Sequence, residues 1–370
     1  MRIVQVRVLS GALSPSHSMQ SGIFRKLLLH WYSLHKRELP WRDICDPYRI
    51  WISEIILQQT RIAQGLDYYE RFLTRFPDVQ SLAAAAEDEV LKLWEGLGYY
   101  SRARNLHAAA HEIALAGAFP TSYEGVRALK GVGDYTAAAI CSFAYHQQVA
   151  TVDGNVYRVL SRIFGIEVPI DTTAGKRHFK ELAQQLLDPE RPADFNQALM
   201  DFGSLQCTPT SPLCDDCPFR PHCVAGRSNS WQLFPVKSKR TAQQHFYFTY
   251  VLITHSGRLL IHRRGAGNIW QGLYEPYLIA STDGPTRPEA DLWVKGLLQQ
   301  PGSRLHLLES NYKHILTHRI IHADFYRIDL SDTIEEKNLS LPENYFFATR
   351  EQAFQYAFPQ LIRLEKYLSD

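Results

Sequence analysis

Four of the six cysteines in this chain of 370 residues lie close together in the sequence. Cys207, Cys214, Cys217 and Cys223 have the spacing C-x6-C-x2-C-x5-C. Thiolates at this density can enclose one metal ion or one iron–sulfur cluster, and the segments that carry them must then fold around it. Zinc sites usually have two separate C-x2-C pairs, whereas this segment has one. The spacing therefore favours one 4Fe–4S cluster and leaves zinc as the alternative.

The composition limits the kind of protein that can carry this cysteine segment. With 370 residues, of which 45% are apolar, we expect two or three domains with sizeable cores. The formal net charge is only +2, so binding to nucleic acid would depend on a local basic patch. No apolar run in the sequence is long enough to span a membrane, and the cysteines are not spaced as in secreted disulfide frameworks. We therefore expect an intracellular protein.

The hydrophobic pattern changes part-way along the chain. From about residue 22 to 227 it predicts helices at 23–34, 46–63, 68–76, 81–93, 102–116, 134–145, 155–164, 173–187 and 194–206. Residues 229–244 lack a clear period and are predicted to be a linker. The pattern then predicts a helix near 287–299 and strands at 246–253, 259–263, 315–321 and 325–330. The C-terminal part is therefore predicted to be an α/β domain.

A glycine turn lies between two of the predicted helices. The backbone N–H groups of Gly131, Val132 and Gly133, with the start of the next helix, can bind a phosphate. Asp153 directly precedes another predicted helix, where a carboxylate can be a simple N-cap or part of a reactive site. Each feature alone is common, but a phosphate site near a lone carboxylate suggests an enzyme that acts on nucleic acid.

Longer motifs around these residues resemble one family. They are Leu-Pro-Trp-Arg at 39–42, Trp-Ile-Ser-Glu-Ile-Ile-Leu-Gln-Gln-Thr at 51–60, Gly-Leu-Gly-Tyr-Tyr-Ser-Arg-Ala-Arg-Asn at 96–105 and Val-Asp-Gly-Asn-Val at 152–156. Together with the cysteine spacing, they are similar to the motifs of the MutY-type adenine DNA glycosylases in the helix-hairpin-helix superfamily. The resemblance covers about residues 22–365.

The resemblance implies a multidomain fold. We expect an all-α glycosylase region at 22–228, with a six-helix barrel at about 42–147 and an iron–sulfur domain formed by 22–41 and 148–228. After the linker at 229–244, a Nudix-like α/β domain is expected at 245–370. Residues 1–21 are expected to be an N-terminal extension, and Met19 is an alternative start of translation.

The resemblance also implies a reaction, the hydrolysis of the N-glycosidic bond of adenine mispaired with 8-oxoguanine or guanine in duplex DNA. Glu54 would be the general acid that protonates adenine N7, and Asp153 would stabilise the oxocarbenium ion that forms on the sugar. Tyr135 and Asn155 would shape the same site. From the helix pattern alone, Glu54 could instead be a solvated residue paired with a polar neighbour.

Two further groups match family positions that contact DNA. The first surrounds the extruded adenine and consists of Arg37, Trp41, Arg42, Leu57 and Gln197, the last of which is Glu in some members. The second, Gln59 and Tyr99, enters the duplex at the mismatch. Without the resemblance, the aromatic residues could be core residues and the arginines surface residues.

Two motifs in the C-terminal part match the family more loosely. Residues 268–274 are similar to a Nudix loop, but the acidic R-E-x-x-E-E box is missing, so pyrophosphate hydrolysis is not expected. The segment 314–318 matches the Phe-Ser-His loop that recognises 8-oxoguanine, with Leu316 and Thr317 in place of Phe and Ser. We therefore expect Thr317 and His318 to be recognition residues. The other interpretation, a His-x3-His metal pair, needs a helix, and this stretch looks β-like.

The residue at position 135 distinguishes alternative functions. A bifunctional glycosylase/AP lyase of the endonuclease III type would need Lys there to form a Schiff base with the sugar, and this chain has Tyr135. A non-catalytic lesion binder would have no need for an acid such as Glu54 aimed at a base. We therefore expect a monofunctional glycosylase that binds double-stranded DNA as a monomer, without a membrane partner.

Overall fold

The computed structural model describes residues 21–238 and 243–367. Contacts between Cα atoms divide the chain into two compact units. The first contains Met1–Glu54 and Phe119–Arg240, and the second contains Ile55–Ala118 and Thr241–Asp370. The chain passes from one unit to the other within helix α2 (Pro47–Leu57). The domain boundaries predicted from the sequence stay predictions.

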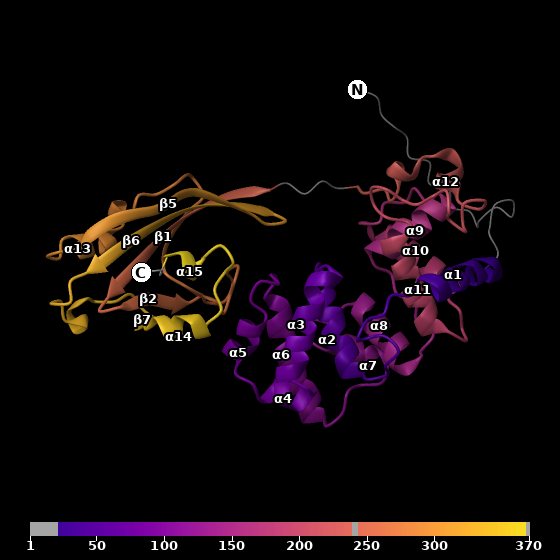
Figure 1. The fold of residues 1–370 in the computed structure, drawn as a ribbon, viewed down its shortest axis with the longest axis horizontal. Coiled ribbons are helices and arrows are strands. Elements are labelled where there is room, and N and C mark those ends of the chain that lie inside the picture. The colour runs from indigo at the N-terminus through magenta and orange to yellow at the C-terminus, as the bar shows by residue number, and fades with distance from the viewer. Residues whose placement is uncertain (1–20, 239–242, 368–370) are drawn as a thin grey trace. The chain divides into compact units, whose positions relative to one another are not determined.

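The first unit consists of helices packed on a common core. Helix α1 (Ser21–His35) packs on α10 (Thr173–Leu186) and α11 (Pro192–Leu205), and α11 also contacts α8 (Asp134–Tyr145) and α9 (Gly154–Phe164) (Figure 1). Phe24 of α1 contacts Phe195 of α11 and Phe219 near the cysteines. The unit also contains two short α-helices, α7 (Tyr123–Ala128) and α12 (Val224–Ser228), and a 3-10 helix, η1 (Trp231–Leu233). The cysteine segment therefore belongs to this core.

In its described residues, the second unit combines helices with a sheet of seven strands. The helices that precede the sheet in the chain are α3 (Ile62–Arg75), α4 (Val79–Ala84), α5 (Glu87–Leu93) and α6 (Ser101–Ala116). The strands are β1 (Gln244–His255), β2 (Arg258–Arg263), β3 (Tyr274–Glu275), β4 (Tyr277–Ser281), β5 (Arg304–Ile315), β6 (Arg319–Leu330) and β7 (Tyr345–Ala348). Their order is β3-β2-β1-β6-β5, with β4 on β1 and β7 on β2. β1 and β6 run parallel, and the other pairs are antiparallel.

The central strand β1 has two buried faces. Tyr250 and Leu252 pack into one core, whereas Val251 and Ile253 pack into another, because successive side chains of a strand point to opposite faces. Helix α13 (Leu292–Leu298) contributes to the second core, and α14 (Arg350–Gln355) and α15 (Leu364–Tyr367) contribute to the first. The predicted α/β character of the C-terminal part is confirmed.

Two of the predicted helices are divided in the structure. The helix expected at 46–63 ends at Leu57, because Gln59 adopts a left-handed backbone with φ of 59° that cannot continue an α-helix. The helix expected at 81–93 is two helices, α4 and α5, separated by the extended residues Ala85 and Ala86.

The strand predicted at 315–321 is divided in the structure between two strands, and its middle is wrong. β5 ends at Ile315 and β6 begins at Arg319, so residues 316–318 form the turn of a hairpin. The β-branched residues at both ends of this segment favoured a strand, but the antiparallel pairing of β5 with β6 requires the chain to reverse there. Among the described residues, no helix is both long and apolar enough to cross a membrane.

Candidate active site and nucleic-acid interface

Glu54 is a buried carboxylic acid in the first unit. Only 7% of its surface is exposed, and its neighbours on α2, Ile52 and Ile55, are also buried. Burial raises the pKa of Glu54 to about 7; a hydrogen bond from Tyr135 lowers it, the nearby charge of Asp153 raises it, and Arg42 lowers it. Glu54 is therefore not a solvated helix residue, and it can hold a proton near neutral pH.

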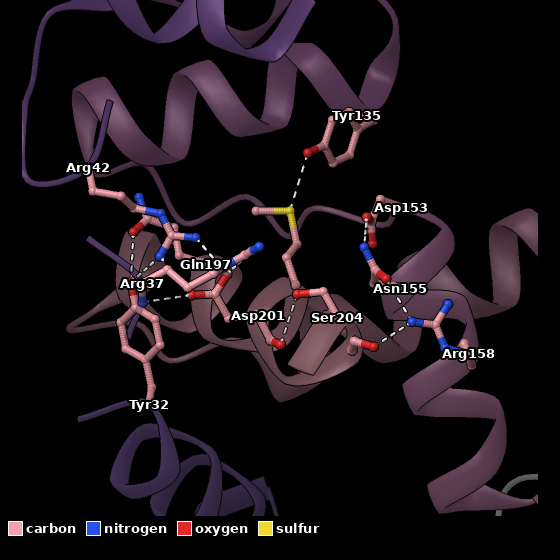
Figure 2. A network of polar contacts seen from close by, with 12 residues as sticks. Tyr32, Arg37, Arg42, Tyr135, Asp153, Asn155, Arg158, Gln197, Asp201 and Ser204 are labelled. Carbon is pink, nitrogen blue, oxygen red and sulfur yellow. Dashed lines mark hydrogen bonds and ion pairs between the residues drawn. The ribbon is translucent and has the colours of Figure 1, made fainter. Parts of the chain in front are cut away.

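Tyr135, at the start of α8, lies next to this carboxyl group. Its hydroxyl lies 3.2 Å from Sδ of Met200 (Figure 2), and the same hydroxyl is hydrogen-bonded with Glu54. The hydroxyl has one proton, and a carboxylate is a stronger acceptor than a thioether. Burial and the negative charges of Glu54 and Asp153 hold the pKa of Tyr135 well above its usual value. The hydroxyl therefore remains a donor toward the site.

Asp153 is the N-cap of α9, which is the simpler of the two roles that the sequence allowed for it. One carboxylate oxygen accepts from the backbone N–H of Val156 at 2.8 Å, and the other accepts from Nδ2 of Asn155 at 2.8 Å (Figure 2). Burial raises the pKa of Asp153 despite these hydrogen bonds. Because Asp153 also influences the pKa of Glu54 and Tyr135, the N-cap faces the same site.

A chain of hydrogen bonds continues from Asp153 toward the cysteines. Asn155 Oδ1 accepts from Nη2 of Arg158 at 2.7 Å, and Nε of Arg158 donates to the carbonyl oxygen of Cys207 at 2.8 Å. Gly203 lies against Asn155, where an added Cβ would come within 2.6 Å of the Asn155 Cβ. This close approach requires glycine at position 203. The sequence motifs gave no indication of Arg158 or Gly203.

The four clustered cysteines line one pocket in the first unit, with Ile163 and Phe202 among its apolar walls. Nη1 of Arg162 lies 3.4 Å from Sγ of Cys207, and the backbone N–H of Gly226 donates to Sγ of Cys223 at 3.2 Å. Within the described residues, no group of three or more His, Cys, Asp or Glu side chains has the geometry of a metal-ion site. Four thiols line this pocket, and N–H donors are directed at the sulfur atoms of Cys207 and Cys223, which is the type of donor set that a four-cysteine cluster uses.

One network of hydrogen bonds contains three of the residues predicted to surround adenine, namely Arg37, Arg42 and Gln197. The sequence did not predict its other two members. Its centre is Asp201 of α11, which is fully buried and accepts from Nε of Arg37 at 2.9 Å and from Nη2 of Arg42 at 2.8 Å. Arg42 also donates to the hydroxyl of Tyr32 at 2.6 Å, and Tyr32 donates to Oε1 of Gln197 at 2.9 Å (Figure 2).

The direction of these hydrogen bonds fixes the amide of Gln197. Arg42 can only donate, so the single proton of Tyr32 is left for Gln197, whose oxygen must face Tyr32. Trp41 is also buried, whereas Leu57 is partly exposed and belongs to the second unit. Tyr32 and Asp201 belong to none of the sequence motifs. Asp201 could have been found, because it is an acidic residue within the apolar pattern of α11.

The glycine turn leads directly into helix α8. Gly131 has φ of 80°, a left-handed conformation that favours glycine, and Gly133 is the N-cap of α8. Both glycines are exposed, whereas Val132 points inward and is buried. Asp134, the first residue of α8, pairs with Arg127 at 2.6 Å, so this acidic group is partly neutralised.

A pocket in the second unit brings together three of the remaining predicted residues. Its volume is 520 Å³, and its lining includes Tyr99, Thr317 and His318. The hydroxyl groups of Tyr99 and Thr317 form a hydrogen bond of 2.6 Å. Tyr99 is 48% exposed, so it is not a core residue, and its φ of 48° is left-handed. Gln59, the other residue predicted to enter the duplex, is also exposed. Its backbone is left-handed as well, which is unusual for residues other than glycine.

Comparisons with known proteins match two parts of the chain to two protein families. Residues 52–188 match the HhH-GPD superfamily of base excision DNA repair proteins, and residues 249–365 match the NUDIX domain. An adenine DNA glycosylase of Buchnera aphidicola (subsp. Schizaphis graminum) is 34% identical over 68% of this chain and 74% of its own length.

The chain belongs to the adenine DNA glycosylase family. The mouse adenine DNA glycosylase is 44% identical over 59% of this chain, but the match covers only 45% of the mouse protein. The chain spans less than half the length of its mammalian relatives. A solved structure of a thermostable thymine-DNA glycosylase is 29% identical, with a TM-score of 0.53 over 56% of this chain and 97% of that chain. The predicted helix-hairpin-helix and Nudix-like parts are therefore confirmed.

Proposed function

We propose that this chain hydrolyses the N-glycosidic bond of adenine opposite 8-oxoguanine or guanine in duplex DNA. The observation that carries the proposal is the arrangement of Glu54, a buried acid with a pKa of about 7, beside Tyr135 and Asp153. A proton on Glu54 can be passed to N7 of an extruded adenine, which makes the base a better leaving group. A water molecule then attacks the sugar, and the DNA strand stays intact.

Asp153 supplies the second carboxylate of the reaction. Its position as an N-cap, with one hydrogen bond from Val156 and one from Asn155, keeps the carboxylate in a fixed orientation. In that orientation it stabilises the positive charge that develops on the sugar when the bond to adenine breaks. The raised pKa of Tyr135 keeps its hydroxyl protonated, so Tyr135 orients Glu54 and is not itself a nucleophile.

Other residues hold the DNA. The exposed N–H groups of Gly131 and Gly133 bind a backbone phosphate at the start of α8. Gln59 and Tyr99 enter the duplex where adenine has left the stack, and Thr317 and His318 contact 8-oxoguanine. The extruded adenine is surrounded by Arg37, Trp41, Arg42, Leu57 and Gln197. The enzyme is expected to work inside the cell as a monomer.

Cys207, Cys214, Cys217 and Cys223 would hold one 4Fe–4S cluster. Such a cluster, when bound, ties the loop that carries the cysteines to the helical core. Arg158 links Cys207 to Asn155, so this chain's own residues connect the cysteine loop to the partner of Asp153. The cluster is therefore expected to support the position of the site.

The proposal is tested by incubating the protein with duplexes that contain adenine opposite 8-oxoguanine, guanine or cytosine, and thymine opposite guanine. We expect adenine to be released opposite 8-oxoguanine and guanine only, without strand cleavage. Treatment with borohydride should trap little covalent product, because position 135 is Tyr. Release of thymine, or efficient trapping, would contradict the proposal in substrate or in mechanism.

A further inference from the structure

One arginine contacts both of the segments that precede the residues proposed to enter the duplex. Arg102 lies in the first turn of α6 and is partly buried. Its Nη1 donates to the carbonyl oxygens of Ile55 and Gln58, each at 2.7 Å. The last carbonyl groups of a helix have no partner within the helix, so Arg102 caps the C-terminal end of α2. Gln59, with its left-handed backbone, follows directly.

The same guanidinium group also holds the segment before Tyr99. Its Nη2 donates to the carbonyl oxygens of Leu97 at 3.3 Å and Gly98 at 3.2 Å. Nε1 of Trp94 donates to the Gly98 oxygen as well, at 3.2 Å, and the guanidinium lies 5.1 Å from the centre of the Trp94 ring. This side chain therefore contacts the residue directly before each of the two residues proposed to enter the duplex.

The backbone of these two residues needs such support. The φ angle is 59° for Gln59 and 48° for Tyr99, a left-handed region that such residues rarely adopt and that persists only where the surroundings enforce it. A guanidinium is planar and presents its N–H donors in a fixed geometry, so it can bridge two segments, whereas the ammonium group of Lys acts as a point charge. Burial lowers the pKa of Arg102 to about 10, so the group keeps its positive charge at neutral pH.

The position of Arg102 suits the extrusion of adenine from the duplex. Extrusion opens a gap in the stack, and filling this gap offsets the cost of unstacking. We propose that Arg102 is a positioning residue for this step, which fixes the spacing of Gln59 and Tyr99 so that both enter the duplex together. Its hydrogen bonds are to backbone oxygen atoms, so it acts through these two residues and not on the base. This inference rests on the proposed function, which assigns Gln59 and Tyr99 to the duplex.

The test follows extrusion separately from bond cleavage. In a Glu54→Gln background, where we expect the base to stay attached, 2-aminopurine replaces the target adenine opposite 8-oxoguanine, and its fluorescence rises when it leaves the stack. For Arg102→Lys we expect the equilibrium constant of extrusion to fall about tenfold, because the bridging hydrogen bonds are lost. Arg102→Gln is shorter and should reduce it at least as much, so either variant serves if the other does not fold. Ile113→Ala, a change at a buried residue about three turns along α6, is the matched control and should lower stability but keep the signal.

A second comparison shows whether Arg102 acts through the two residues. Gln59→Ala combined with Tyr99→Ala should itself reduce the fluorescence, and the addition of Arg102→Lys should then have little further effect. An Arg102→Lys protein with the full fluorescence rise would overturn this inference, and so would an equal loss from Arg102→Lys in both backgrounds, while the proposed function would stay intact. If the protein with Gln59→Ala and Tyr99→Ala keeps the full signal, the proposed entry of these residues into the duplex is itself wrong.

Discussion

The hydroxyl groups of Tyr99 and Thr317 lie 2.6 Å apart, although 218 positions separate the two residues in the chain. Tyr99 precedes helix α6, and Thr317 lies in the turn between β5 and β6. The hydrogen bond joins the residue proposed to enter the duplex to a residue proposed to recognise 8-oxoguanine. We therefore expect the two to act as one unit when DNA binds.

A double-mutant cycle measures this relationship. Tyr99→Phe and Thr317→Val each remove one hydroxyl with little change in shape, and each should weaken binding to an 8-oxoguanine duplex by about 1 kcal/mol. The double variant should be weakened by clearly less than the sum of the two, because the single changes remove the same hydrogen bond. Fully additive losses in the dissociation constants would show that the two hydroxyl groups act independently.

The hairpin turn supplies a prediction about selectivity. Replacement of both Thr317 and His318 by Ala should reduce the preference for 8-oxoguanine over guanine opposite adenine by about tenfold or more, since polar partners of the lesion are lost. Both residues are exposed, so the thermal unfolding of the protein should change little. If the rate ratio is unchanged, these two residues are not the recognition residues.

The pKa of Glu54 predicts how stability depends on pH. Because burial raises this pKa from 4.5 to about 7, the folded state binds the proton more tightly than the unfolded chain does. Its contribution to stability is fully present below about pH 4.5 and is lost as the pH rises through 7. Between pH 5 and pH 8, the free energy of unfolding of the wild type should therefore fall by about 3 kcal/mol relative to Glu54→Gln. Denaturant titrations of both proteins at the two pH values measure the difference, and parallel curves would show that Glu54 titrates normally.

Asp201 is predicted to contribute more to the free energy of unfolding than an exposed acidic residue does. Asp201→Asn would leave Arg37 and Arg42 without their shared counter-charge and should lower the free energy of unfolding by about 3–5 kcal/mol. Asp194→Asn is the matched control, because its pair with Arg191 is exposed and should contribute at most about 1 kcal/mol. Equal losses in a denaturant titration would show that the buried network has no special importance.

The sequence predicted the residues of the candidate site better than the residues that hold them in position. Glu54 and Asp153 could be found because each lies in a long, specific motif, and the cysteines because their spacing is unusual. The bond of Arg158 with Cys207, and the bonds of Asp201 with Arg37 and Arg42, were missed because they join segments far apart in the chain, which no local pattern records.

The secondary structure shows the same limit. The helices at α1 and α8 follow from periodicity, but the break at Gln59 depends on a left-handed residue without a glycine to signal it. The turn at 316–318 depends on how β5 pairs with β6, and the three residues contain no glycine or proline that would indicate a turn. Strand pairing, which no local pattern records, decided the second case.

The proton on Glu54 is the central claim, and one measurement tests it most directly. Adenine release from an 8-oxoguanine·adenine duplex is followed under single-turnover conditions for the wild type and for Glu54→Gln, with duplex binding measured in parallel. We predict at least a 100-fold loss of rate in Glu54→Gln, with binding largely retained, because the amide cannot donate an acidic proton to adenine N7. A Glu54→Gln protein that releases adenine at the wild-type rate would contradict the account.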